Sequence, residues 1–245
     1  AENYTMADRW ILSRMNTVVK EVTENLEKFE LGIGLQKVYE FIWEQFCDWY
    51  IEMVKPRLFD RQAKGRLEAL YVLNEVLKTS MKLLHPFMPF ITEEVYQHLY
   101  MQDESIMVSS WPVFREDLHD PVSENKMNTV MEAIRSIRNI RAEMKVPVTR
   151  KARAVFVIGD ENMGTIFAQE QSTFMRLAGV SELAVHKNRE NVPEDAVSSV
   201  IQGVEIYIPM DELLDFEKEM ERLLKDKENL EAELTRVNGK LQNES

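Results

Sequence analysis

Apolar residues recur every three or four positions between Thr5 and Met144, and this spacing constrains the fold more than any other feature of the sequence. Each such stripe lets a helix bury one side against its neighbours. Long helices with short connections favour an up-and-down bundle. The pattern predicts an antiparallel helical bundle at residues 1–146, with helices at 5–29, 35–54, 61–84 and 124–144 and a shorter one opened by Pro89.

Local signals set the predicted ends of the first two helices. Thr5 followed by Asp8 is a variant of the capping box, an arrangement that starts a helix. Gly32 and Gly34 are predicted to separate the first helix from the second. Pro56 is predicted to stop the second helix, because a proline interrupts helical hydrogen bonding.

After Pro147 the sequence becomes richer in β-branched residues, and a small α+β domain is predicted at 147–210. Its paired apolar runs around Gln202-Gly203 are typical of a hairpin with a two-residue turn. The expected elements are a strand at 152–158, a helix at 161–178 ended by Gly179, a strand at 183–185, and the hairpin strands 197–201 and 204–208.

The apolar period becomes seven at residues 211–245, which predicts the first helix of a coiled-coil arm. One helix cannot bury its own apolar stripe, so we expect it to pair with another helix, including the same helix of a second copy. The alternative is a lone solvated helix. The fold class is thus mainly α: the bundle, the small α+β unit and a long C-terminal coiled-coil helix. The two heptad positions are held by Leu213, Met220, Lys227, Leu234 and Leu241, and by Phe216, Leu223, Leu230 and Val237.

The net charge of −12 argues against a simple nucleic-acid binder, because phosphate contacts need Lys and Arg. The stretch from Arg135 to Arg153 is the exception, with seven cations and one acid. Its side chains Arg135, Arg138, Arg141 and Lys145 share one broad face of the last bundle helix, where they could follow a polyphosphate groove. A solvated face without a ligand is the open alternative.

Catalytic patterns are missing from the sequence. One cysteine excludes an intrachain disulfide, and the four histidines have no partners at metal-ligand spacing. No glycine-rich phosphate loop is present. We therefore expect a binding part without its own cofactor, catalytic residue or metal site. The short apolar runs and the single cysteine indicate a cytoplasmic chain with no membrane span.

Several blocks of sequence resemble the class I aminoacyl-tRNA synthetases. Ala7–Asn16 (ADRWILSRMN) resembles the opening of their anticodon-binding bundle, and Leu84–Glu94 (LHPFMPFITEE) resembles a block shared by the valine, isoleucine and leucine enzymes. Three further blocks are similar to the valyl-tRNA synthetase branch, and the resemblance spans nearly the whole chain. They are Glu44–Glu52 (EQFCDWYIE), Ile137–Pro147 (IRNIRAEMKVP) and Phe174–Val180 (FMRLAGV).

The resemblance implies a C-terminal fragment that holds the anticodon stem-loop of tRNA(Val), with the closing heptads as half of a tRNA-binding arm. The family's nucleotide-binding signatures and its editing domain are absent, so the fragment should be inactive alone. ATP and Mg²⁺ would belong to the catalytic domain of the parent enzyme. A stand-alone RNA-binding module and a coiled-coil interaction module remain alternatives.

The candidate tRNA contacts lie on the first and last helices of the bundle. Trp10, flanked by Arg9 and Arg14, could stack on an unpaired base, or it could pack in the core. The segment from Arg138 to Lys145 could instead join the bundle to the α+β unit. The candidates are Arg9, Trp10, Arg14, Lys20, Arg135, Arg138, Arg141 and Lys145.

Overall fold

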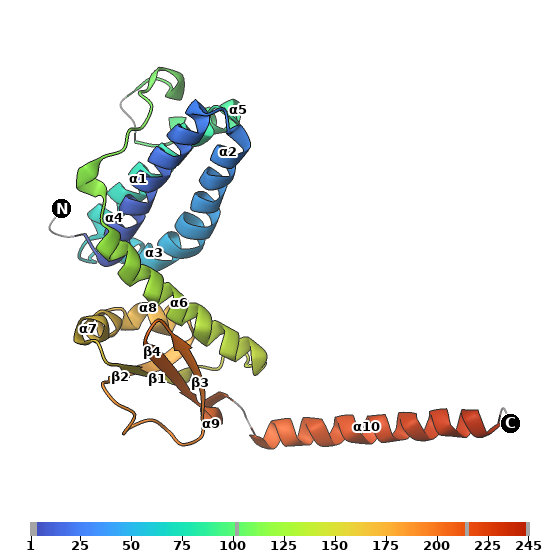
Figure 1. Cartoon of the computed structure of the whole chain (residues 1–245). Coiled ribbons are helices and arrows are strands. Elements are labelled where there is room, and N and C mark those ends of the chain that lie inside the picture. The colour runs from blue at the N-terminus through green and yellow to red at the C-terminus, as the bar shows by residue number, and fades with distance from the viewer. Residues whose placement is uncertain (1–3, 101–102, 214–215, 244–245) are drawn as a thin grey trace. The chain divides into compact units, whose positions relative to one another are not determined.

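The computed structural model describes residues 4–100, 103–213 and 216–243, and the chain forms two compact units, Ala1–Thr129 and Val130–Ser245 (Figure 1). Helix α6 (Pro121–Glu143) belongs to both units, since the division falls within it. The predicted domain boundaries after residues 146 and 210 remain predictions. None of the described helices is both long and apolar enough to cross a membrane.

The first unit is helical, as its sequence pattern predicts. Helix α1 contacts both α2 and α4, and Figure 1 shows the three helices running alongside one another. The largest buried side chains of this unit include Trp10 of α1 and Phe41 and Tyr50 of η1. The helical elements are α1 (Met6–Glu27), α2 (Leu31–Glu40), the π-helix η1 (Phe41–Ile51), α3 (Glu52–Phe59), α4 (Arg66–Leu84), α5 (Pro89–Gln97), the 3₁₀ turns η2 (Ile106–Val108) and η3 (Glu116–Leu118), and the start of α6.

The capping box at the start of α1 is confirmed. The Asp8 N–H donates to Thr5 Oγ1 at 3.3 Å, and the Thr5 N–H donates to Asp8 Oδ2 at 2.9 Å. Both groups belong to the first turn, where a helix has no backbone acceptors for its own N–H groups. The predicted start of the chain's first helix therefore agrees with the structure.

The predicted break at Gly32 and Gly34 is wrong, because both glycines lie inside α2. The reversal occurs earlier, at Phe29, whose φ of 60° is in the left-handed region. The Phe29 N–H donates to Leu26 O at 3.0 Å, and the next N–H, from Glu30, donates to Asn25 O at 2.8 Å. This pair of bonds is the Schellman motif, which normally places a glycine at the left-handed position.

Phe29→Gly should raise the free energy of unfolding of the first unit by roughly 1 kcal/mol, because glycine adopts a positive φ without the steric penalty of a side chain. The Phe29 side chain is 87% exposed, so its removal sacrifices little packing. Urea unfolding followed by tryptophan fluorescence measures the change. Phe29→Ala, which keeps a Cβ, is the control and should gain much less. A destabilised Phe29→Gly protein would contradict this account of the turn.

Pro56 does not stop the second helix, which contradicts the sequence prediction. Residues 31–59 are helical throughout, with η1 between α2 and α3, and Pro56 lies inside α3. A proline removes its own N–H, but its carbonyl still accepts a hydrogen bond. The Asp60 N–H donates to Pro56 O at 3.3 Å, so the helix closes one further turn and ends at Phe59.

The second unit contains a four-stranded sheet in the order β2-β1-β4-β3, which leaves β2 and β3 at its edges. Strands β1 and β2 are parallel and are connected through α7 and α8, whereas β4 is antiparallel to both β1 and β3. Phe156 packs edge-on against Phe167 and Phe174 with ring centroids 5.1 and 5.2 Å away. The elements are β1 (Ala152–Ile158), α7 (Glu161–Gln169), α8 (Gln171–Leu177), β2 (Val180–His186), β3 (Ala196–Ile201), β4 (Val204–Pro209) and α9 (Met210–Leu213).

The strand and hairpin predictions for this unit are confirmed, but the single helix predicted at 161–178 is interrupted at Glu170. Gln202 and Gly203 have φ values of 33° and 80°, as a tight hairpin turn requires. Gly179 has a φ of 67° directly after α8 and its C-cap, in agreement with the predicted helix end.

Helix α10 (Phe216–Asn243) occupies most of the predicted heptad region. Its described side chains, at residue 220 and residues 224–238, are exposed. Leu213 is not part of that exposed stripe: it lies in α9 and is buried, and α9 contacts β1 and β4. The side chains of Phe216, Leu223 and Leu241 lie outside the described residues, and coiled-coil pairing remains a prediction.

Candidate nucleic-acid interface

Two arginines of the predicted cationic face bind backbone carbonyls within the second unit. Arg138 Nε donates to Leu177 O at 2.8 Å. Arg141 donates to Arg150 O at 2.6 Å, Pro147 O at 3.2 Å and Gly179 O at 3.3 Å. Burial lowers the pKa of Arg141, since a desolvated cation is less stable. These contacts favour the alternative that this segment ties α6 to the α+β fold.

The rest of the basic stretch is partly occupied in the same way. Arg150 donates from Nε to Glu212 O at 2.6 Å and from Nη2 to Asp211 O at 3.0 Å. Arg153 pairs with the Glu212 carboxylate at 3.6 Å. The local excess of positive charge therefore also stabilises the unit that contains it.

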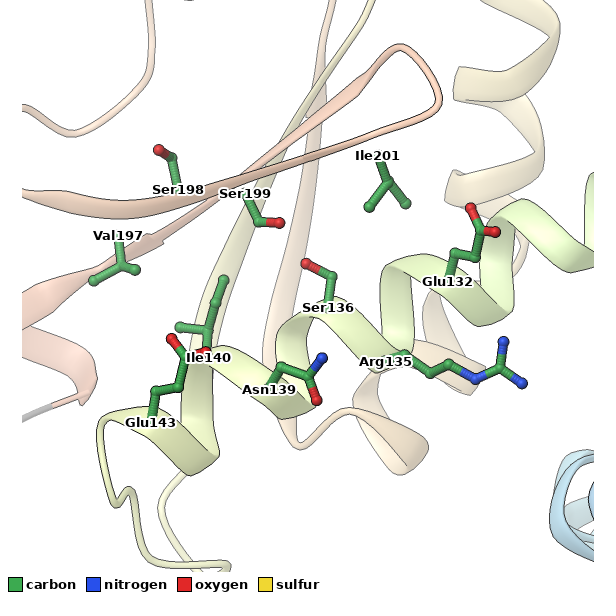
Figure 2. Close-up of a pocket in the computed structure, with 10 residues that line it drawn as sticks. All are labelled: Glu132, Arg135, Ser136, Asn139, Ile140, Glu143, Val197, Ser198, Ser199 and Ile201. Carbon is green, nitrogen blue, oxygen red and sulfur yellow. The ribbon is translucent and has the colours of Figure 1, made fainter.

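Arg135 and Lys145 remain exposed on or beside α6. Arg135 borders a groove of about 410 Å³ between α6 and β3. Figure 2 shows Ser136 pointing toward β3, whereas the Arg135 guanidinium extends away from Ser199. Lys145 has a φ of 51° and ends α6 in a second Schellman motif, in which the next residue, Val146, donates to Arg141 O at 2.8 Å. These two cations are presented to solvent.

The candidates on α1 have different environments. Arg14 pairs with Glu124 at 3.3 Å, and the Lys20 ammonium lies 5.4 Å from the centre of the Phe114 ring. Arg9 is exposed, and its guanidinium makes no hydrogen bond or ion pair to a described residue. Trp10 is 1% exposed, so the prediction that it is a stacking platform is wrong. Its ring packs in the bundle core, where apolar contacts outweigh its unpaired indole N–H.

Sequence analysis missed a buried ion pair that joins α1 to α3. The Asp8 carboxylate is 0% exposed and accepts hydrogen bonds from both terminal nitrogens of Arg57, at 2.6 and 2.9 Å. The Tyr50 hydroxyl donates to the same carboxylate at 2.7 Å. Burial would raise the pKa of Asp8, but hydrogen bonds from Arg57, Tyr50 and Thr5 outweigh it and leave that pKa lowered. No sequence signal linked Asp8 to Arg57.

The described residues offer no site for a metal ion: they contain no group of three or more His, Cys, Asp or Glu side chains placed to bind one. The arrangement instead provides exposed cations on a helical scaffold. Such cations can contact RNA phosphates, which carry most of the electrostatic affinity of protein–nucleic acid complexes. The geometry is therefore that of a binding surface.

Comparison with known proteins agrees with this interpretation. The family model for the anticodon-binding domain of tRNA ligase matches residues 8–156. The valine–tRNA ligase of Clostridium acetobutylicum is 50% identical over 242 residues, which are 99% of this chain and 27% of that protein. The C. perfringens enzyme is 49% identical, with 99% and 28% covered, and the Carboxydothermus hydrogenoformans enzyme is 43% identical, with 99% and 27% covered.

The chain thus spans just over a quarter of the length of these relatives. The family match includes nearly all of α1, the helices α2 to α6 and most of β1. Because it covers more than half of the chain, it defines the family of the protein. The chain belongs to the family of tRNA-ligase anticodon-binding domains, and it corresponds to the part of valine–tRNA ligases that contains this domain.

Proposed function

We propose that this chain binds the anticodon stem-loop of tRNA(Val), while valine is attached on a part of the enzyme outside these 245 residues. The observation that carries the proposal is the family match over residues 8–156. ATP and Mg²⁺ would be handled by that other part, in the cytoplasm. The role of this chain's residues is to bind and orient the RNA, with Arg9, Lys20, Arg135 and Lys145 as its exposed cations.

A filter-binding titration of the full chain with tRNA(Val) tests this function. Binding should weaken steeply with rising salt, because each phosphate contact releases counterions from the RNA. An unrelated tRNA serves as the specificity control. Failure to bind tRNA(Val) even at low salt would overturn the proposal. The chain alone should not charge tRNA(Val) with valine.

Arg135→Gln combined with Lys145→Gln should weaken tRNA binding and reduce the salt dependence. If each side chain binds one phosphate, the slope of log affinity against log salt should fall by roughly 0.7–0.9 for each cation removed. Lys187→Gln, at an exposed lysine of the same unit, is the matched control. An unchanged slope in the double variant would remove both residues from the interface. Arg138 and Arg141 are unsuitable for this test because they bind carbonyls within the fold.

Self-association through α10 is a second proposed property, supported by its exposed apolar side chains Met220, Leu230, Leu234 and Val237. In this proposal two copies bury their heptad stripes against each other. Sedimentation at two concentrations should show concentration-dependent dimers. Leu230→Glu with Leu234→Glu should abolish them, whereas substitution of exposed Glu228 by Gln should not. A monomer at both concentrations would contradict the pairing.

A further inference from the structure

The first unit contains a groove of about 770 Å³ beside α1 and α4, closed on one side by the loop that contains Trp111. Its size is within the range of about 300–1,000 Å³ typical of small-molecule sites. Buried apolar side chains of α1 contribute to its lining, namely Leu12, Met15 and Val19. The groove can therefore accept a flat, partly apolar group of the size of a nucleobase.

Two aromatic rings in the groove lining are accessible to such a group. Tyr71 on α4 is 55% exposed, and Trp111 in the loop is 36% exposed. The Trp111 indole N–H donates to Thr23 Oγ1 at 2.9 Å, which fixes the orientation of that ring. Exposed aromatic rings are the common stacking surfaces for unpaired bases. Because every base has a π face, such a ring can stack on any of them.

The loop beside the groove is held in place before any ligand binds. The Asn16 side chain is buried and pairs with the backbone of Arg115 in both directions. Its amide nitrogen donates to Arg115 O, and its oxygen accepts from the Arg115 N–H, each at 2.7 Å. Because this loop is already ordered, binding of a ligand costs less conformational entropy than it would if the loop had to be ordered at the same time.

The charges in the groove are largely paired within the protein. Lys78 pairs with Glu75, and Arg115 pairs with Asp117 at 2.6 Å. A phosphate would compete with these carboxylates for the cations. A base needs only a face to stack on and polar groups at its edge. The groove therefore suits the base, and the nearby exposed Arg9 suits the adjoining phosphate.

We propose that this groove receives an unpaired base of the bound RNA, which stacks on Tyr71 and Trp111. The inference rests on the proposed tRNA-binding function and specifies where RNA outside a helical stem is held. Stems are recognised by shape and charge, whereas a base displaced from a loop can insert into a groove. The groove would then hold the base, while the exposed cations of the chain contribute the salt-dependent part of the affinity.

Fluorescence anisotropy with the full chain and a labelled hairpin of the tRNA(Val) anticodon arm tests the inference. Tyr71→Leu and Trp111→Leu should each weaken binding at least about 5-fold, the lower range for removal of one stacked base. Their slopes of log affinity against log salt should stay unchanged, because neither substitution removes a cation that binds phosphate. Tyr39→Leu is the matched control, since Tyr39 is 59% exposed on α2 and outside the groove lining.

A second hairpin, whose loop nucleotides lack bases, separates stacking from general damage to the protein. It should bind the unmodified chain about as weakly as the groove variants bind the normal hairpin. The Tyr71 hydroxyl makes no hydrogen bond to a described residue, so Tyr71→Leu should fold normally even if Trp111→Leu does not; thermal unfolding verifies this.

The possible failures are distinguishable. If the unmodified chain binds the hairpin but Tyr71→Leu binds it as tightly as Tyr39→Leu, the groove inference is overturned and the proposed function stands. Equal binding of the normal and baseless hairpins overturns the inference in the same way. If the unmodified chain binds neither the hairpin nor tRNA(Val), the proposed function fails, and the inference fails with it.

Discussion

Asp8→Ala should lower the free energy of unfolding of the first unit by about 3–5 kcal/mol, the usual effect of removing one partner of a buried ion pair. Asp8 is fully buried, and its removal takes away the carboxylate that accepts from Arg57 and Tyr50, so that Arg57 keeps only its 3.4 Å contact to Gly65 O among the described residues. All four tryptophans lie in the first unit, so tryptophan fluorescence during urea unfolding follows that unit alone. Asp117→Ala is the control; its pair with Arg115 is exposed, so removing it should change stability far less than Asp8→Ala does.

The same carboxylate should make the first unit sensitive to acid. Because the folded pKa of Asp8 lies below its ordinary value of 3.8, its stabilising contribution is complete above that pH. The contribution is lost as the pH falls through the lowered pKa, since folding must then accept a protonated Asp8. Asp8→Asn should remove this part of the acid dependence. An Asp8→Ala protein that loses less than about 1 kcal/mol would refute a structural role for the ion pair.

Arg141→Ala should destabilise the second unit by about 2–4 kcal/mol, because hydrogen bonds from a charged donor are among the stronger ones in proteins. Its guanidinium donates to the carbonyls of Pro147, Arg150 and Gly179, and alanine would remove this charged donor from all three. Amide hydrogen exchange of β1 and β4 measures the effect, since tryptophan fluorescence does not report on this unit. Faster exchange in both strands is expected.

Two further variants define the cause. Arg141→Lys should recover little of the stability, because an ammonium is a point charge and cannot reproduce the planar fork that reaches several carbonyls. Arg189→Ala is the matched control; the arginine of its pair with Glu205 is exposed, so exchange should change far less than in Arg141→Ala. If exchange in Arg141→Ala equals that of the control, Arg141 has no structural role in this unit and again becomes a candidate for RNA contact.

The elements that follow from local rules could be predicted from the sequence. The capping box of Thr5 and Asp8 needs only a spacing of three residues, and the hairpin around Gln202-Gly203 needs only turn residues between two apolar runs. Gly32, Gly34 and Pro56 were interpreted wrongly because glycine and proline disfavour a helix without excluding it. Packing of the surrounding helix decides the outcome at such positions.

The candidate site was less predictable, because a sequence shows which side chains are charged and not which groups they meet. Arg141 and Arg135 are predicted on the same broad face of one helix, yet Arg141 binds three carbonyls while Arg135 borders an open groove. Trp10 is flanked by arginines in sequence but points into the core. Asp8 and Arg57 are 49 residues apart, so their pairing depends on the tertiary fold.

The position of β3 at the edge of the sheet has a consequence for handling the protein. One row of its backbone hydrogen-bonding groups has no strand partner among the described residues, and its sequence AVSSVI contains neither charge nor proline. Charged residues and prolines within an edge strand commonly prevent it from acting as a template for strands of other molecules. Glu194 and Asp195 carry negative charge directly before β3 but lie outside the strand itself. Concentrated stocks should therefore be prone to aggregation by cross-molecular strand addition.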